Sequence, residues 1–148
     1  MDPSRKNSKN IEISLGGTSQ NSSLKLVPLS IFRDRRLTPL EAVIRYLREK
    51  RKLSYHGIAS LLQRNVRDIY KTYAHAFDKS FLVEVKSVHT LLVPVSIFAN
   101  RELSALENLV LYLKEKLELS YRQISVLLNR NERTIWTVYQ RARQKNER

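Results

Sequence analysis

VPLSIF at residues 27–32 and LSYHGIASLLQRN at residues 53–65 both occur a second time in this chain. They return 66 residues later as VPVSIF (residues 93–98) and LSYRQISVLLNRN (residues 119–131). A long period with a constant offset indicates two copies of one small structural unit. The fold is therefore decided by what one copy forms.

The two copies define the predicted domains. Residues 26–77 align on residues 92–143 without an insertion, and about half of the positions are identical. We predict repeat 1 at residues 26–77 and repeat 2 at residues 92–148, which has a basic C-terminal end. Residues 1–25 are rich in Ser, Asn and Lys, so we expect a flexible basic N-terminal arm. Residues 78–91 are predicted to be a short apolar connector, which could span at most roughly 46 Å if extended.

Each repeat carries start signals for three helices. Thr38 with Glu41, and Ser104 with Glu107, have the spacing of a capping box, in which each side chain bonds the other residue's backbone N–H. Apolar residues follow at the spacing i, i+3, i+4, i+7, which marks one face of a helix. The fold class is therefore predicted as all-α, with two tandem three-helix domains.

The second and third helices of each copy have helix-turn-helix spacing. In repeat 1, Ala59 is the small residue where the two helices would cross, Gln63 begins the turn, and Ile69 is the apolar residue six positions later. In repeat 2 the same places are occupied by Ser125, Asn129 and Ile135. This spacing lets the third helix stand out of the domain and enter the major groove of DNA.

The charge of the chain favours a polyanionic partner. The net charge is +13, from 27 basic and 14 acidic residues, and most of the excess belongs to the two repeats. Nucleic acid is the most common partner of such a chain. We expect no membrane partner, because no apolar run of about 18 residues is present. The absence of cysteine fits a reducing cytoplasm.

Five segments of repeat 2 resemble a known family: LSALE (residues 103–107), YL (112–113), LSYRQI (119–124), LL (127–128) and RTI (133–135). They are similar to the C-terminal, region 4-like promoter-reading domain of bacterial sigma factors, and the likeness extends over both repeats. The resemblance implies a DNA-binding fold.

Side chains that the helical core does not need are the candidates for DNA contact. Arg133 can pair with guanine, Gln140 with adenine and Glu132 with cytosine, so we expect repeat 2 to read sequence and repeat 1 mainly to grip the duplex. Arginines such as Arg64 and Arg130 are expected to contact phosphates. The predicted DNA-binding residues are Arg64, Arg67, Asp68, Lys71, Arg122, Arg130, Glu132, Arg133, Thr134, Trp136, Thr137, Gln140 and Arg141.

Together these patterns predict a sequence-specific protein for double-stranded DNA, a transcriptional regulator of the cytoplasm and its nucleoid. We expect no enzymatic activity, no cofactor and no metal site, since His56, His75 and His89 have no partners at metal-ligand spacing. Two alternatives remain open. One is an architectural or RNA-binding protein, and the other is an adaptor that binds RNA polymerase or another transcription protein.

Overall fold

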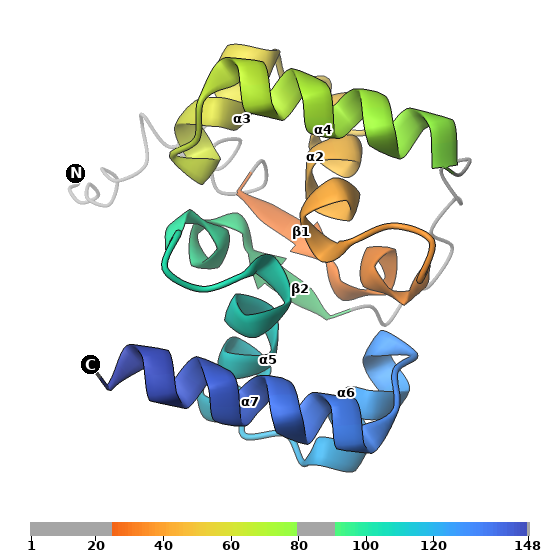
Figure 1. Ribbon diagram of the computed structural model, residues 1–148. Helices are drawn as coiled ribbons and strands as arrows, with labels where there is room; N and C mark the ends of the chain where they lie inside the picture. The colour runs from red at the N-terminus through yellow and green to blue at the C-terminus, as the bar shows by residue number, and fades with distance from the viewer. Residues whose placement is uncertain (1–24, 80–90, 148) are drawn as a thin grey trace, which may run out of the picture.

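The computed structural model describes residues 25–79 and 91–147, and these are mostly helical (Figure 1). The all-α prediction is confirmed at this level, with one small two-stranded sheet among the described residues. The predicted arm and most of the predicted connector lie outside the described residues. The elements of repeat 1 are β1 (Leu26–Pro28), the 3-10 helix η2 (Leu29–Arg33), α2 (Pro39–Glu49), α3 (Tyr55–Leu62) and α4 (Val66–Lys79). The elements of repeat 2 are β2 (Leu92–Pro94), the 3-10 helix η3 (Val95–Ala99), α5 (Ala105–Glu115), α6 (Tyr121–Leu128) and α7 (Glu132–Asn146).

The predicted helix starts are confirmed. The Thr38 hydroxyl accepts a hydrogen bond from the Glu41 N–H at 3.2 Å, and the Glu41 carboxylate accepts one from the Thr38 N–H at 2.9 Å. Ser104 and Glu107 form the same reciprocal pair at the start of α5. Each box satisfies backbone donors that a helix start leaves without partners, which explains why both first helices begin at their predicted positions.

The turn before the third helix is built in the same way in both repeats. Gln63 and Asn129 adopt the left-handed backbone conformation, with φ of 52° and 55°. This conformation ends α3 and α6 and reverses the chain. The Asn65 carboxamide oxygen then accepts a hydrogen bond from the Arg67 N–H at 2.7 Å, and Asn131 caps α7 in the same manner. A short, capped turn therefore fixes the angle at which α4 and α7 leave the preceding helices.

The VPLSIF stretch and its copy join the two repeats. β1 pairs antiparallel with β2, and Val27 lies opposite Val93, its own counterpart 66 residues later. The Leu29 N–H donates to the Leu91 carbonyl at 2.7 Å. The equivalent bond in the opposite direction runs from the Val95 N–H to the Lys25 carbonyl and has the same length. The pairing is unchanged when the repeats are exchanged, so an approximate two-fold axis passes between the two strands.

The core is shared across this axis. The rings of Phe32 and Phe98, which are also counterparts, lie 5.8 Å apart. η2 of repeat 1 packs on α6 of repeat 2, while η3 packs on α3, and the buried side chains form one continuous cluster. α2 and α5 lie in the middle of the molecule, with α4 and α7 at its opposite ends (Figure 1).

A shared core predicts that both repeats unfold together. Phe98 is completely buried, and the change Phe98→Ala should lower the free energy of unfolding by about 3–5 kcal/mol. Thermal unfolding followed by calorimetry should remain a single transition at a lower temperature. The matched control Val126→Ala, at a site 63% exposed, should change stability by no more than about 0.5 kcal/mol. Two separate transitions, of which Phe98→Ala moves only one, would contradict the shared core.

Candidate nucleic-acid interface

The outer faces of α4 and α7 carry most of the residues predicted to contact DNA. Ile69 and Ala76 of α4 are completely buried, and so are Ile135 and Ala142 of α7. The helical period then leaves the intervening side chains on the opposite face. The predicted residues exposed on these helices are Arg67, Asp68, Lys71, Glu132, Arg133, Thr134, Trp136 and Arg141. The structure therefore leaves this set accessible to a partner.

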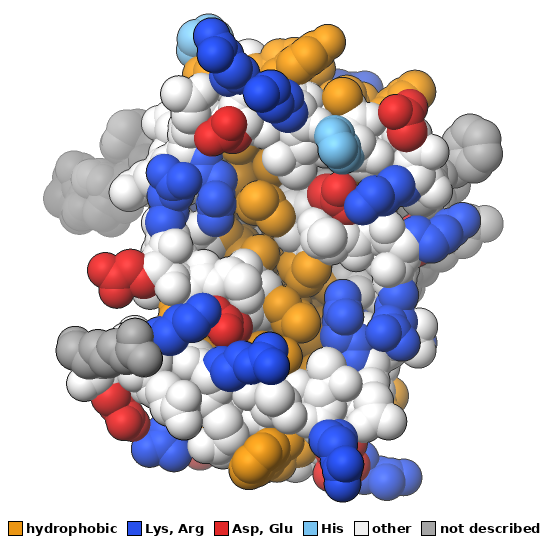
Figure 2. Space-filling view, in the orientation of Figure 1, with side chains coloured by type: hydrophobic (Ala, Val, Ile, Leu, Met, Phe, Trp, Pro, Cys, Tyr) orange, Lys and Arg blue, Asp and Glu red, His pale blue; other side chains and the backbone are white. Residues whose placement is uncertain are grey.

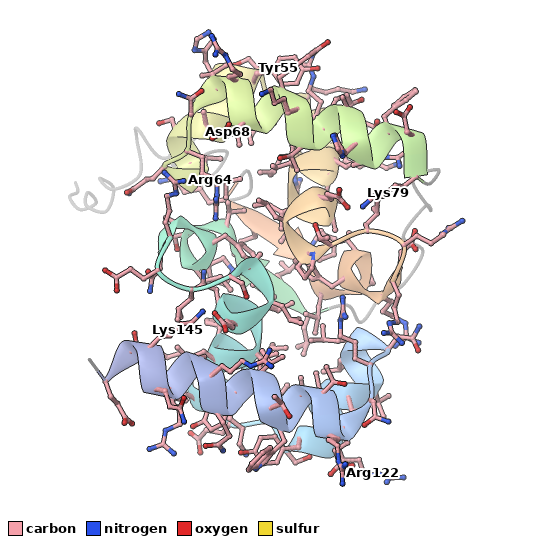
Figure 3. The ribbon with its side chains drawn as sticks, in the orientation of Figure 1. Tyr55, Arg64, Asp68, Lys79, Arg122 and Lys145 are labelled. Carbon is pink, nitrogen blue, oxygen red and sulfur yellow. The ribbon has the colours of Figure 1, made fainter. Side chains whose placement is uncertain are left out.

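The other predicted residues lie beside these faces. Thr137 and Gln140 are partly buried on α7, and Arg122 is exposed on α6. Arg64 and Arg130 are partly buried in the turns that precede α4 and α7. Most of the predicted set thus forms two separate surfaces, one on each repeat, at opposite ends of the molecule, whereas Arg64 and Arg130 lie nearer the junctions between the repeats (Figures 1 and 3).

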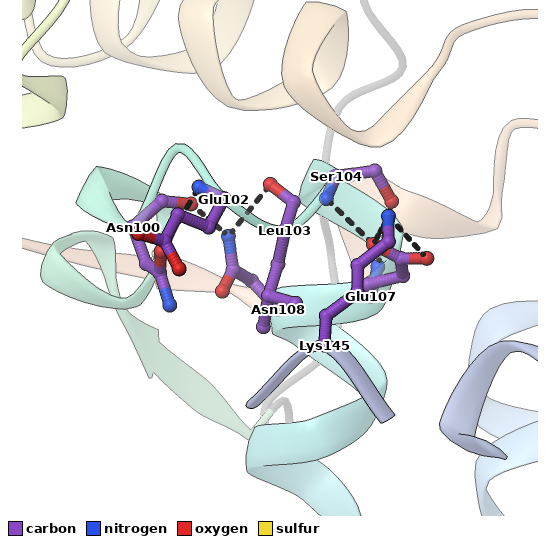
Figure 4. Close-up of polar contacts among 7 residues, drawn as sticks. All are labelled: Asn100, Glu102, Leu103, Ser104, Glu107, Asn108 and Lys145. Carbon is purple, nitrogen blue, oxygen red and sulfur yellow. Dashed lines mark hydrogen bonds and ion pairs between the residues drawn. The ribbon is translucent and has the colours of Figure 1, made fainter. Parts of the chain in front are cut away.

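An ion pair holds the far end of each third helix. The Lys145 ammonium lies 2.9 Å from the carboxylate of Glu107, the capping-box residue of α5 (Figure 4). Lys79 and Glu41 make the equivalent contact at 3.0 Å in repeat 1. Burial alone would raise the pKa of Glu107, but hydrogen bonds from Lys145 and from the Ser104 N–H outweigh it, and the pKa is lowered. One buried carboxylate therefore serves both the start of α5 and the anchoring of α7.

A tyrosine anchors the middle of each third helix. The Tyr73 hydroxyl donates to the Glu49 carboxylate at 2.7 Å, and Tyr139 donates to Glu115 at 2.8 Å. Burial and the bond to Glu49 raise the pKa of Tyr73 to about 12. The Tyr73 hydroxyl therefore stays protonated and keeps donating at neutral pH. These bonds fix α4 against α2 and α7 against α5.

Repeat 2 has an additional polar contact where the chain enters α5. Asn108 is buried, and its side-chain N–H donates to the Asn100 carbonyl at 2.9 Å (Figure 4). Ala42 occupies the equivalent place in repeat 1. The bond ties α5 to the segment that follows η3 and so helps to hold η3 at the junction between the repeats.

Arginines from both repeats meet at this junction, and sequence reasoning missed two of them, Arg33 and Arg35. Arg33 donates to the carbonyls of Val126 and Leu127 at the end of α6. A hollow beside this contact is lined by Arg33, Arg35, Ser125, Val126, Asn129, Arg130 and Asn131. Burial lowers the pKa of Arg130, and the nearby positive charge of Arg35 lowers it further. Positively charged side chains from both repeats thus line this hollow.

At the equivalent junction on the other side of the two-fold axis, Arg64 lies near Arg101, which sequence reasoning also missed. Burial lowers the pKa of Arg64, and Arg101 adds a like charge nearby. The Nε atom of Arg64 is buried without a hydrogen-bond partner among the described residues, on the side of the turn that faces repeat 2 (Figure 3). Identical arginines at equivalent positions were visible in the sequence, but only the docking of the repeats brings Arg35 to Arg130 and Arg101 to Arg64.

The aromatic residue of each third helix is about half exposed, but its surroundings differ between the repeats. In repeat 1, Tyr70 is 56% exposed and its ring packs edge-on against Tyr55, with centroids 5.4 Å apart. In repeat 2, Trp136 is 51% exposed and forms the wall of an open hollow with Tyr121, Glu132, Arg133 and Thr137. The hollow places an arginine, a carboxylate and an indole together on the outer face of α7.

Positive charge is spread over the face of the molecule drawn in Figure 2. Figure 2 shows Lys and Arg side chains at the ends and along both sides of one face, with Asp and Glu among them and hydrophobic side chains along the middle. Within the described residues, no group of three or more His, Cys, Asp or Glu side chains could hold a metal ion. No helix of the described part has the length and hydropathy needed to cross a bilayer.

No protein-family model, no curated protein and no solved structure matches this chain.

Removal of the Lys145 ammonium tests the anchoring of α7. The change Lys145→Met should raise the pKa of Glu107 and lower stability at neutral pH by about 1 kcal/mol. Because the folded-state pKa lies below 4.5, the stabilisation is present above that pH and is lost as the pH falls through the folded value. The stability difference between the wild type and the variant should therefore shrink in acid.

Carboxyl NMR titration and denaturant unfolding at several pH values measure these effects. The control Arg143→Met removes an exposed ion pair with Glu147 on the same helix and should leave the Glu107 titration unchanged. An unchanged Glu107 pKa in Lys145→Met would show that the ion pair does not form in solution.

Proposed function

We propose that the protein binds double-stranded DNA in a sequence-specific way through two tandem helix-turn-helix units and acts as a transcriptional regulator. The function would consist of binding, without catalysis or a cofactor. The protein would act at the nucleoid in the cytoplasm. The observation that carries the proposal is the matched pair of outer faces on α4 and α7, whose polar side chains the core does not use. The resemblance of both repeats to the promoter-reading domain of sigma factors supports the same function.

The local geometry supports insertion of α4 and α7 into DNA grooves. Ala59 of α3 is buried, α3 packs on α4, and Gln63 makes the left-handed turn between these two helices. Such a turn lets one helix brace the unit while the next presents its N-terminal residues to base edges. The anchors Lys79 and Lys145 hold the opposite ends of these helices against the core. The outer faces are therefore presented on supported helices.

The charge distribution supports binding to the phosphate backbone. With a net charge of +13, the chain would release counterions from DNA, and its affinity would fall steeply with salt. The arginine pairs at the repeat junctions, Arg35 with Arg130 and Arg101 with Arg64, are suited to phosphates because a bound anion relieves the repulsion between like charges. These pairs would position the protein, and the third helices would read bases.

Selection from a random pool of duplexes at near-physiological salt tests the proposal. Recovery of a two-part motif with fixed spacing is the expected result. Recovery without a motif would favour the architectural or RNA-binding alternative. A failure to recover DNA would favour the adaptor that binds a transcription protein.

The two repeats should contribute differently to sequence preference. Arg133→Ala and Gln140→Ala in α7 should each relax the preference at one base pair by about 1–3 kcal/mol. Arg67→Ala and Lys71→Ala in α4 should weaken binding to all sequences more evenly. Competition binding with single-base variants of the selected site measures both effects. The division is wrong if the α4 changes alter sequence preference more than the α7 changes do.

The junction arginines should contribute affinity without specificity. The double change Arg35→Ala with Arg101→Ala should weaken binding to every duplex and reduce the slope of log affinity against log salt by about 2. Arg36→Ala is the matched control, since Arg36 is exposed and already paired with Asp34 at 3.0 Å. Fluorescence anisotropy over a salt series gives the slopes. Equal slopes for the double variant and the wild type would exclude the junctions as phosphate contacts.

A further inference from the structure

The approximate two-fold axis fixes how α4 and α7 are oriented to each other. Val27 faces Val93 and Phe32 faces Phe98, and each pair joins equivalent residues of the two repeats. α4 and α7 consequently lie at opposite ends and run in opposite directions (Figure 1). The equivalent anchors Lys79 and Lys145 accordingly lie on opposite sides of the molecule (Figure 3).

We infer that this single chain recognises two half-sites of different sequence in inverted orientation, with the centre of the DNA site opposite the β1–β2 pair. The inference rests on the proposed function and names the class of DNA site that this function would use. A tandem repeat in sequence suggests a direct repeat in DNA, but the docking gives the opposite orientation.

The argument for inversion is one of symmetry. The two strands of DNA are antiparallel, so a duplex has two-fold axes perpendicular to its length. When the two-fold axis of the protein coincides with one of these axes of the DNA, the two repeats contact half-sites that point in opposite directions. A direct repeat requires units related by translation along the duplex, and the antiparallel pairing of β1 with β2 does not give this relation.

The docking also fixes the spacing of the half-sites. β1 and β2 are hydrogen-bonded and the two repeats share one core, so the distance between α4 and α7 is set by packing rather than by the length of residues 80–90. Half-sites read from one side of a duplex lie about 10–10.5 base pairs apart, centre to centre, or a multiple of that distance. One spacing should therefore be strongly preferred.

The two half-sites should differ because the outer faces differ. Arg67 and Arg133 are the same residue at equivalent positions, and they predict one feature common to both halves. Several other exposed or partly buried positions diverge between the copies: Val66 and Glu132, Asp68 and Thr134, Tyr70 and Trp136, Lys71 and Thr137, Ala74 and Gln140, and His75 and Arg141. The expected DNA site therefore has two half-sites in opposite orientation whose sequences are similar but not identical.

The first experiment compares duplexes that carry the same two selected half-sites in opposite orientation (inverted or everted) or in the same orientation (direct), at several spacings. The wild-type chain should bind one duplex with opposite orientation, at one spacing, roughly tenfold or more tightly than every direct arrangement. Tighter binding to a direct arrangement would overturn the inference and leave the proposed function intact. Absence of any sequence preference would instead defeat the proposed function.

A symmetrised chain gives the second test. The variant V66E/D68T/Y70W/K71T/A74Q/H75R copies the outer face of α7 onto α4 at mostly exposed positions and should fold like the wild type. Selection with this variant should recover an inverted repeat whose halves are identical. The matched variant E132V/T134D/W136Y/T137K/Q140A/R141H should recover the other half-site in duplicate. Identical halves recovered in direct orientation from either variant would contradict the two-fold arrangement on DNA.

Discussion

The antiparallel pairing of β1 with β2, centred on Val27 and Val93, is the constraint on which the rest of the structure depends. It turns two consecutive segments of one chain into units related by a two-fold axis. Because each 3-10 helix follows directly after its strand, η2 packs against α6 of repeat 2 and η3 packs against α3 of repeat 1. Phe32 and Phe98 then close the centre of the core. The positions of α4 and α7 follow from this junction.

The junction also explains how such small repeats are stable. A unit of about 52 residues buries little apolar surface on its own, and its core would be marginal. Sharing one core enlarges the buried cluster and leaves most other faces available for charge. The positive charge opposes folding, since Arg35 lies close enough to Arg130, and Arg101 close enough to Arg64, to disfavour the charged forms of Arg130 and Arg64. The shared core offsets this repulsion, which a bound polyanion would also relieve.

Local features of the fold could be predicted from the sequence, whereas the docking could not. Capping pairs such as Thr38 with Glu41 act within one helical turn, so spacing alone identifies them. The buried faces of α4 and α7 follow from their helical period, and so does the exposure of residues such as Arg133. β1 and β2 have three residues each, too few for a clear strand pattern, and each ends in proline. Their pairing, and the meeting of Arg35 with Arg130, depend on contacts between repeats that no local pattern contains.

Joining the two units in one chain has a consequence that a homodimer with the same axis would not share. The halves of a homodimer carry identical reading helices, and their association depends on protein concentration. Here the docking is unimolecular, so occupancy of a DNA site would depend on the first power of concentration. The outer faces are also free to diverge, as Gln140 and Ala74 have, while Val27 and Val93 stay identical at the centre. Identity at the junction and divergence on the outer helices are what two-fold docking requires if the two repeats read different half-sites, as proposed.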